Sequence, residues 1–549
     1  MSVNLKTIYA FAREMHSKNI NKPIQYGTAG FRTKATDLDY VMFRMGVLAA
    51  LRSRVKNTAV IGLMITASHN PEEDNGIKLV DPHGEMLEQS WEVLATQLAN
   101  VSDSELEATV EKIVKDLNID LNLKANVFIG MDTRYSSPSL CKAAVDGVLS
   151  IRGSPREFGI VSTPMLHYFV LCANTDQAYG KPTEEGYYTK LITAFKTLRG
   201  DVTSNGKYSP KFIFDGANGV GGKKMVQFQK RLGDSIDVDI YNNGKGKLNF
   251  KCGADFVKVQ QCSPHGIPIE KNVRCVSVDG DADRVVYHFV DDNDVFHLLD
   301  GDRIATLLAG FLMEKVKATG LDIGFGLVQT AYANGASTRY ITDELRVSVA
   351  CVPTGVKHLH HRAQDFDIGV YFEANGHGTV LFSNDAKLKL KYASLDSSLE
   401  ESQINAAKEL MNLIDLTNET VGDAISDMLL VETVLHSRGW DLNDWLNTYT
   451  DLPNRQLKVT VQDRTLITTK DAERICVTPE GLQDEIKNLV SKYQDGRAFV
   501  RPSGTEDIVR VYAEAATRDE ADSLATEVAK AVFRLAGGVG EEPKQNFTH

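Results

Sequence analysis

The sequence has no long hydrophobic run and no paired cysteines, and both absences limit the kind of protein it encodes. No apolar stretch in its 549 residues approaches the roughly 20 residues of a membrane-spanning helix. Residues 1–19 have the pattern of an amphipathic helix and not of a signal peptide. The seven cysteines are odd in number and lack CxxC spacing, so neither a disulfide framework nor a zinc site is indicated. We therefore expect a cytoplasmic protein with reduced cysteines.

The sequence also lacks an excess of basic residues. It has 61 Lys and Arg against 73 Asp and Glu, which gives a net charge of -12 and a pI near 5.6. This balance argues against a nucleic acid or an anionic membrane as partner, because both attract basic surfaces. Any phosphate that the protein binds must be held by local basic residues. Nothing in the sequence indicates the oligomeric state.

Short apolar runs alternate with helical stretches through most of the chain, which predicts an α/β fold with parallel or mixed sheets. The length and the 42% hydrophobic content suit several cores. We predict three similar mixed α/β domains, residues 1–195, 196–303 and 304–447, and a smaller α+β C-terminal domain, residues 448–549. Strands are expected at 60–65, 127–131, 211–215, 273–278, 323–329, 370–373, 457–461 and 508–514.

A hydroxyl lies at the end of the first of these strands, in the stretch TASHNPEEDNGIK. Ser68 follows the apolar residues 59–65, and ligands of α/β sheets usually bind at strand ends. Ser68 is therefore a candidate nucleophile. His69 follows it directly, and Lys78 lies ten residues further on. The alternative is an ordinary Ser/Asn/Pro turn.

Three carboxylates follow the predicted strand 273–278, in the stretch VSVDGDADR. In extended backbone, Asp279, Asp281 and Asp283 would share one face, where their mutual repulsion requires a cation. Oxygen ligands of this kind suit Mg²⁺. A calcium EF-hand is excluded, because Arg284 and Val290 replace its required glycine and glutamate. The alternative is a solvated acidic turn.

The glycine-rich stretch GANGVGGKK does not match a nucleotide-binding loop. Ala217 occupies the first glycine position of a Walker loop, and Lys224 stands where Ser or Thr must hold Mg²⁺. No convincing GxGxxG dinucleotide unit is present either. We interpret the stretch as a structural turn from strand to helix, and no redox cofactor is indicated.

The C-terminal stretch AFVRPSGTEDIVRVY predicts an anion site between two strands. Arg501 offers a bidentate donor, and Ser503, Gly504 and Thr505 offer hydroxyls and a close backbone approach. Arg510 lies on the following strand. The alternative is an ordinary hairpin loop.

A fourth polar stretch, YFEANGHGTV, is suited to sugar hydroxyls. Glu373, Asn375 and His377 alternate after a strand, so they could share a face. A carboxylate and an amide can bind neighbouring hydroxyl groups. The alternative is a polar turn. The stretch PTGVKH, which contains His358, is either another sugar contact or a capping turn before a helix.

These stretches together resemble the loops of the α-D-phosphohexomutases, and the resemblance covers nearly the whole chain. It implies four domains around a central cleft and an active serine that lends a phosphoryl group to a sugar phosphate and takes it back. It also implies a Mg²⁺ loop at DGDAD and a loop at RPSGT that holds the idle phosphate. EANGHG is similar to the corresponding loop in the branch that acts on N-acetylglucosamine phosphates.

The resemblance also assigns roles to residues. Arg32, in GTAGFR, would stabilise the transferring phosphoryl group, and the general acid or base stays open between Lys78, His69 and His377. Arg134 and His167 match family loops without a clear role. The implied catalytic residues are Ser68, Arg32, His69 and Lys78; the metal ligands are Ser68, Asp279, Asp281 and Asp283; the substrate-binding residues are His358, Glu373, Ala374, Asn375, His377, Arg501, Pro502, Ser503, Gly504, Thr505 and Arg510.

The implied reaction interconverts N-acetylglucosamine 6-phosphate and N-acetylglucosamine 1-phosphate through a 1,6-bisphosphate, and it feeds UDP-N-acetylglucosamine synthesis. Mg²⁺ would be the cofactor, a hexose 1,6-bisphosphate the activator, and a small sugar phosphate the partner. Two alternatives stay open. One is a phosphohexomutase that acts on glucose or mannose phosphates, and the other is a non-catalytic sugar-phosphate sensor on the same fold.

Overall fold

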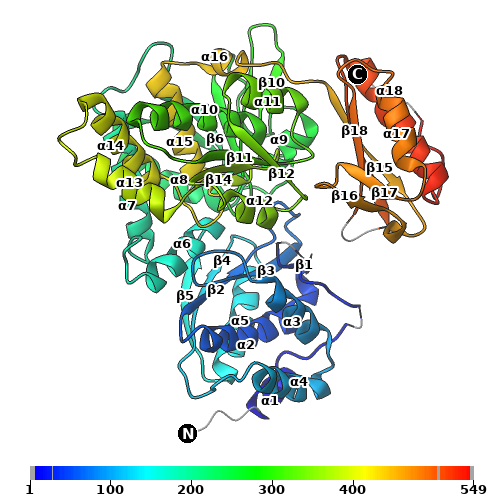
Figure 1. Cartoon of the computed structure of the whole chain (residues 1–549). Coiled ribbons are helices and arrows are strands. Elements are labelled where there is room, and N and C mark those ends of the chain that lie inside the picture. Colours follow the sequence, from blue (N-terminus) through cyan, green and yellow to red (C-terminus); the bar gives the residue numbers. More distant parts are fainter. Residues whose placement is uncertain (1–5, 21, 28, 504–506, 545–549) are drawn as a thin grey trace. The chain divides into compact units, whose positions relative to one another are not determined.

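The computed structural model describes residues 6–20, 22–27, 29–503 and 507–544. Helices and strands alternate along the chain, as predicted for an α/β protein (Figure 1). The chain divides into two compact units. The first unit holds residues 1–300, 375–379 and 411–442, and the second holds residues 301–374, 380–410 and 443–549.

The first unit begins with a five-stranded mixed sheet in the order β1-β3-β2-β4-β5. Strands β2, β4 and β5 are parallel, and β3 pairs with β2 and β1 in antiparallel register. Apolar side chains of α2 and β2 lie in one large core. The elements are α1 (Lys6–Glu14), β1 (Phe31–Lys34), α2 (Asp39–Val55), β2 (Val60–Ile65), β3 (Asp74–Val80), α3 (Gln89–Asn100), α4 (Asp103–Asp116), β4 (Asn126–Met131), α5 (Ser137–Ser150), β5 (Ser154–Ile160), α6 (Thr163–Asn174) and α7 (Glu184–Arg199).

A second five-stranded sheet of the same unit has the order β10-β9-β8-β6-β7. Strand β8 runs parallel to β6, and the chain returns antiparallel in β9 directly after the acidic loop. The loop between β8 and β9 is therefore short. The elements are β6 (Lys211–Asp215), α8 (Val220–Leu232), β7 (Asp237–Tyr241), α9 (Ala254–Gln260), β8 (Arg274–Val278), β9 (Val285–Val290), β10 (Phe296–Leu299) and α15 (Ala424–Arg438).

The second unit holds a four-stranded sheet in the order β12-β11-β13-β14 and a three-stranded antiparallel sheet in the order β15-β19-β18. Helices α17 and α18 cover the three-stranded sheet (Figure 1). The elements of these two parts are α10 (Gly301–Thr319), β11 (Phe325–Thr330), α11 (Gly335–Arg339), β12 (Ser348–Val352), α12 (Val356–Ala363), β13 (Ile368–Phe372), β14 (Gly378–Phe382), α13 (Asn384–Ala393), α14 (Glu401–Leu416), α16 (Leu442–Leu446), β15 (Asn454–Thr460), β16 (Thr468–Lys470), β17 (Ile475–Thr478), α17 (Leu482–Val490), β18 (Arg497–Pro502), β19 (Ile508–Glu514) and α18 (Arg518–Leu535). Some residues of β14, α14 and α16 are counted with the first unit.

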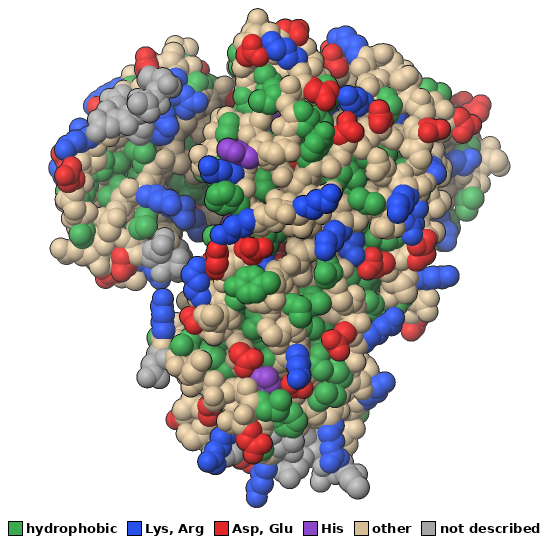
Figure 2. Space-filling model, turned by 180° about the vertical axis from the view of Figure 1, so that it is seen from behind, with side chains coloured by type: hydrophobic (Ala, Val, Ile, Leu, Met, Phe, Trp, Pro, Cys, Tyr) green, Lys and Arg blue, Asp and Glu red, His purple; other side chains and the backbone are tan. Residues whose placement is uncertain are grey.

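The predicted fold class is confirmed, and every predicted strand appears with its ends shifted by a few residues at most. Our four domain boundaries stay a prediction. Among the described residues, no helix is both long enough and apolar enough to cross a membrane. On the face of the molecule shown in Figure 2, acidic and basic side chains are interspersed.

Candidate active site

Ser68 follows strand β2 in a conformation that few non-glycine residues adopt. Its backbone has φ +51°, in the left-handed region, and its side chain is fully buried. The Oγ atom donates a hydrogen bond of 2.6 Å to Oδ2 of Asp279 and lies 3.4 Å from Nδ1 of His69. The backbone N–H of Ser68 donates to Oγ1 of Thr66 at 3.0 Å. The strand end therefore holds one hydroxyl in a fixed position beside the acidic loop.

The three aspartates of the acidic loop converge, with one oxygen of each lying within 4.8 Å of the others. Our geometric reason for this convergence was wrong, because the loop is a tight turn and not extended backbone. Ala282 has φ +57°, and its N–H donates to the carbonyl of Asp279 at 3.1 Å. The carboxylate of Asp279 also accepts the N–H groups of Asp283 and Arg284. The turn itself therefore directs the carboxylates together.

The chemistry of this cluster suits a hard divalent cation. All three side chains are buried, and among the described residues Oδ1 of Asp281 and Oδ1 of Asp283 have no hydrogen-bond partner. Burial and the charges of Asp283 and Asp281 raise the pKa of Asp279 well above its ordinary value. An ion with oxygen preference and small radius, such as Mg²⁺, would neutralise this charge and use the free oxygens.

Two cations of the first sheet lie near the aspartates. Nζ of Lys78, on β3, is 3.1 Å from Oδ2 of Asp281 and 3.0 Å from Oδ2 of Asp283. Burial lowers the pKa of Lys78, but these two carboxylates outweigh it and the net pKa is raised. Arg32, on β1, is half-buried, and within the described part of the chain its buried Nε has no acceptor. An unused guanidinium N–H at this place is suited to a phosphate oxygen.

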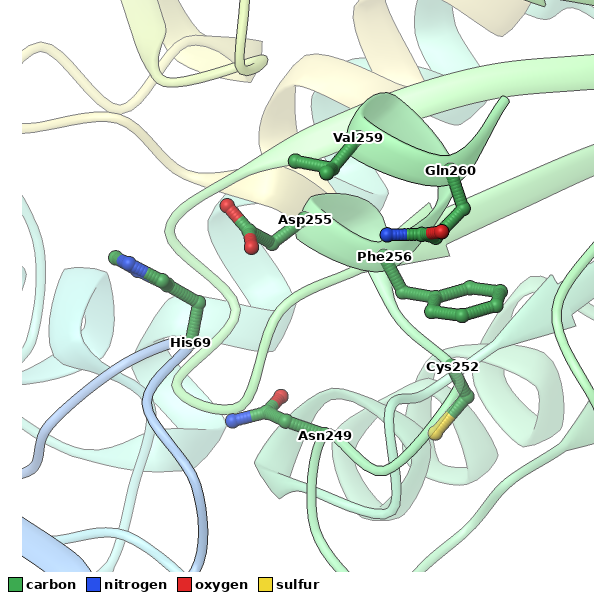
Figure 3. Close-up of a pocket in the computed structure, with 7 residues that line it drawn as sticks. All are labelled: His69, Asn249, Cys252, Asp255, Phe256, Val259 and Gln260. Atoms are coloured by element: carbon green, nitrogen blue, oxygen red, sulfur yellow. The ribbon is translucent and has the colours of Figure 1, made fainter. Parts of the chain in front are cut away.

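His69 is neutral at physiological pH. Burial and the positive charges of Arg284 and Arg32 lower its pKa to about 2. Its ring faces a cavity of about 170 Å³ whose other lining residues come from the segment 249–260 (Figure 3). In Figure 3 the carboxylate of Asp255 points toward the side of the cavity on which His69 lies. With a pKa this low, the His69 ring is a weak proton acceptor at neutral pH and acts mainly as a neutral hydrogen-bonding group.

The stretch EANGHG forms a turn instead of the extended segment that we expected. Gly376 has φ +87°, and the N–H of His377 donates to Oδ1 of Asn375 at 3.0 Å. Because the chain turns, alternate side chains do not share one face. His377 instead places Nδ1 2.8 Å from the carbonyl oxygen of Asp283, so it joins the acidic loop. Glu373 and Ala374 precede this turn and belong to the second unit.

In the second unit, Arg501 and Arg510 are direct partners in the antiparallel pair β18–β19. Like charges opposite one another are unfavourable unless an anion lies between them. Pro502 ends β18, and the N–H of Ser503 donates to the carbonyl of Ile508 at 2.8 Å. Gly504 and Thr505 lie outside the described residues. His358 lies in α12 and is exposed.

Glu473 is a residue of this region that sequence reasoning missed. It follows strand β16, and its Oε1 accepts from Nε of Arg501 at 2.8 Å. Its Oε2 accepts from the N–H of Thr354 at 3.0 Å and from the Thr354 hydroxyl at 2.5 Å. Glu473 therefore links Arg501 to the PTGVKH stretch. No motif surrounds Glu473, so only the fold reveals the contact.

Two further missed contacts support the first unit's site. Oγ1 of Thr163, the first residue of α6, donates to Oδ2 of Asp281 at 2.6 Å. Nη2 of Arg134 donates to the carbonyls of Asn70 at 2.8 Å and of Ser68 at 3.2 Å. A signal existed for both, since the motifs around Arg134 and His167 matched family loops. The sequence did not show what these side chains contact.

His167 makes the stability of the folded protein depend on pH. It is buried, its Nδ1 lies 2.7 Å from the carbonyl oxygen of Gly84, and burial lowers its pKa from 6.5 to about 4. As pH falls below 6.5, the unfolded chain binds a proton at His167 that the folded chain does not, so stability is lost. Between pH 7 and pH 5 this group should remove about 2 kcal/mol from the free energy of unfolding.

We expect the variant His167→Asn, whose amide can still donate to Gly84, to lose less stability over the same pH interval. Urea unfolding at pH 7 and pH 5 measures the difference between the two proteins. Equal losses in wild type and variant would contradict the assignment to His167.

The sequence matches four family models along its length. Residues 29–105 and 105–178 match the α/β/α domain I of phosphoglucomutase/phosphomannomutase, and residues 457–531 match the C-terminal domain of that group. Residues 177–286 and 300–440 match domains II and III of phosphoacetylglucosamine mutase AMG1. The phosphoacetylglucosamine mutase of Homo sapiens is 53% identical over 534 residues, which cover 97% of this chain and 98% of the human protein.

This chain belongs to the phosphoacetylglucosamine mutase family. The Candida albicans phosphoacetylglucosamine mutase is 47% identical over 94% of this chain and 97% of its own. A solved structure of the Aspergillus fumigatus N-acetylphosphoglucosamine mutase, in complex with GlcNAc-6P and magnesium, superposes with a TM-score of 0.93 at 46% identity. That comparison covers 98% of this chain and 100% of the Aspergillus chain.

Proposed function

We propose that this protein interconverts N-acetylglucosamine 6-phosphate and N-acetylglucosamine 1-phosphate by way of a phosphoserine at Ser68 and a 1,6-bisphosphate. One observation carries the proposal. This chain is 53% identical to the human phosphoacetylglucosamine mutase over nearly its whole length, and it has a buried serine hydroxyl beside three convergent aspartates. We further infer a cytosolic location and a role in supplying UDP-N-acetylglucosamine synthesis.

Ser68 is the group that would carry the phosphoryl. Phosphoryl transfer depends mainly on positioning and on neutralisation of charge. Phospho-Ser68 gives its phosphoryl group to the free hydroxyl of the sugar phosphate, so the P–O bond to Ser68 breaks, a P–O bond to the sugar forms, and the proton of the sugar hydroxyl ends on the Oγ of Ser68. The resulting 1,6-bisphosphate turns end for end, and Ser68 accepts the other phosphoryl group. The phosphoenzyme is thereby restored.

The cationic residues of the first unit would hold the transferring group. The buried Nε of Arg32 has no acceptor among the described residues, and it would donate to an oxygen of the transferring phosphoryl group. Lys78 lies within hydrogen-bond distance of Asp281 and Asp283, so its ammonium is held at the aspartate cluster that also contains Asp279, the acceptor of the Ser68 hydroxyl. Asp279, Asp281, Asp283 and Ser68 would hold Mg²⁺, which supplies charge neutralisation and orients the phosphoryl oxygens when it is bound.

The remaining predicted residues would bind the sugar and its idle phosphate. Arg501 and Arg510 form a cationic pair for a phosphate, to which Ser503, Gly504 and Thr505 would add donors. Asn375 and Glu373 would bind sugar hydroxyls, with His358 near the ring. The family's EANGHG wording favours the N-acetylated sugar over glucose or mannose phosphates.

A substrate competition tests the proposal. N-acetylglucosamine 6-phosphate and glucose 6-phosphate are offered together with Mg²⁺ and a trace of glucose 1,6-bisphosphate, and phosphorus NMR follows the products. We expect the N-acetylated 1-phosphate to form at least about tenfold faster, a preference within the range that pocket contacts supply. A preference for glucose would overturn the substrate assignment and keep the mechanism.

Activity on neither sugar would overturn the proposed function and favour the sensor. Intact-peptide mass spectrometry of the same preparation then distinguishes an inactive fold from a dephosphorylated enzyme. A phosphate on Ser68 speaks against the sensor. Its absence requires the assay to be repeated after incubation with the bisphosphate.

A further inference from the structure

The carbonyl groups that flank the active hydroxyl are held from two sides. The carbonyl oxygens of Ser68 and Asn70 accept hydrogen bonds from Nη2 of Arg134, within the first sheet's part of the unit. The same two oxygens accept from Nδ2 of Asn249, at 2.8 Å and 2.9 Å. Asn249 follows strand β7 by eight residues and belongs to the part of the unit built on the second sheet. The serine loop is therefore clamped between these two parts.

The amide of Asn249 is fully used by this clamp. A side-chain amide nitrogen has two hydrogens, and here each is directed to one carbonyl. Reversing the amide would place its oxygen against two carbonyl oxygens, so the hydrogen-bond pattern fixes its orientation. An aspartate at this position has nearly the same shape but no hydrogen to donate.

The backbone of Asn249 is anchored in turn. Its N–H donates to the carbonyl of Ala217 at 2.9 Å, in the turn between β6 and α8. The carboxylate of Asp215 accepts the N–H groups of Ala217 and Gly253, which ties the segment 249–253 to that turn. Asn249 has φ +56°, a left-handed conformation that asparagine and glycine tolerate well.

The metal loop meets the serine loop at the same point. A Cβ on Gly280 would lie 2.5 Å from the carbonyl oxygen of Ser68 and 3.1 Å from Nδ2 of Asn249. The N–H of Val220 also donates to the carbonyl of Gly280 at 3.0 Å. Any shift of the Ser68 carbonyl therefore changes the position of Ser68 relative to Asp279, which accepts the hydrogen bond of its hydroxyl.

We propose that Asn249 is a positioning residue for phosphoryl transfer, acting through the backbone of Ser68. This inference rests on the proposed function. Asn249 holds the strained serine loop against the metal loop, so that the Ser68 oxygen stays aligned for transfer in both directions. Both amide hydrogens of Asn249 bind the serine loop and not the sugar. Removal of the Asn249 side chain should therefore lower the rate of phosphoryl transfer and leave substrate affinity nearly unchanged.

The test compares three variants with wild type: Asn249→Gly, Asn249→Asp and, as matched control, Asn272→Gly. Asn272 is exposed, also left-handed at φ +57°, and its Nδ2 bonds Asp292. Glycine keeps the left-handed backbone and removes only the side chain. Kinetics at saturating Mg²⁺, circular dichroism melting, and a single turnover of labelled phosphoenzyme with N-acetylglucosamine 6-phosphate are measured for each.

We expect kcat and the single-turnover rate to fall about 10-fold in Asn249→Gly and about 100-fold in Asn249→Asp, with KM within about twofold of wild type. The control should keep wild-type rates. Equal rates for Asn249→Gly and the control would overturn the inference, as would a loss that follows only the fraction of unfolded protein. If the wild-type protein itself converts neither sugar phosphate, the proposed function is contradicted instead.

Discussion

Alanine at position 68 is expected to abolish mutase turnover, with a loss of at least about 10⁴-fold in kcat. The hydroxyl of Ser68 is the only group at this strand end that the mechanism uses to carry the phosphoryl, and neither His69 nor Asp279 can replace it in a reversible transfer. If Ser68→Ala keeps even a few per cent of wild-type activity, the phosphoserine mechanism is wrong. A coupled assay of 1-phosphate formation gives the rate.

The fold should survive this change. The substitution removes one hydrogen bond to Asp279, which still accepts the N–H groups of Asp283 and Arg284, so the free energy of unfolding should fall by about 1 kcal/mol. Ser139→Ala is a matched control, because the Ser139 hydroxyl donates only to the carbonyl of Ser136 in the same unit. It should leave activity unchanged.

The second large effect is expected at the acidic loop. Asp281→Asn removes one of three convergent charges while it keeps the shape of the side chain, and its amide must now face the hydroxyl of Thr163 and the ammonium of Lys78. We expect activity at fixed Mg²⁺ to fall by about 100-fold or more, as for other losses of a metal ligand or its orientation. Raising Mg²⁺ should restore only part of it.

Asp292→Asn provides the comparison, since it changes another aspartate in an acidic stretch of the same sheet. Residues 291–294 form a turn between β9 and β10, and Asp292 is exposed in it. This variant should keep wild-type rates and the wild-type Mg²⁺ dependence. Full activity of Asp281→Asn without added metal would contradict the role of the loop, whatever the control shows.

Periodicity sufficed for most of the fold because the strands are buried and apolar. Strand β6 appears at Lys211–Asp215 and strand β2 at Val60–Ile65, with the predicted ends, since each is a run of apolar residues closed by polar ones. The strand-to-helix turn of GANGVGGKK was also predicted correctly. Such local signals say which segments are strands and where they end.

The arrangement within the site depended on backbone conformations that the sequence did not reveal. Ala282 at φ +57° and Gly376 at φ +87° form turns in two segments for which the sequence pattern predicts extended backbone. Alanine rarely adopts a left-handed conformation, so the sequence does not predict one at position 282. The conformation persists because hydrogen bonds to Asp279 offset its strain. Asn249 and Glu473 act across long sequence separations, 181 residues to Ser68 and 28 to Arg501, and no local pattern marks them.

The left-handed backbone of Ser68 lowers the stability of the folded protein, while the proposed reaction requires the side chain that causes this cost. A residue with a Cβ costs about 1 kcal/mol or more in that conformation, a cost that glycine avoids. Selection for resistance to heat alone would therefore favour glycine at position 68 and so remove the hydroxyl. Thermostable versions of this protein are better sought elsewhere, at exposed left-handed residues such as Asn57 and Asn118, which lie in turns that end helices α2 and α4.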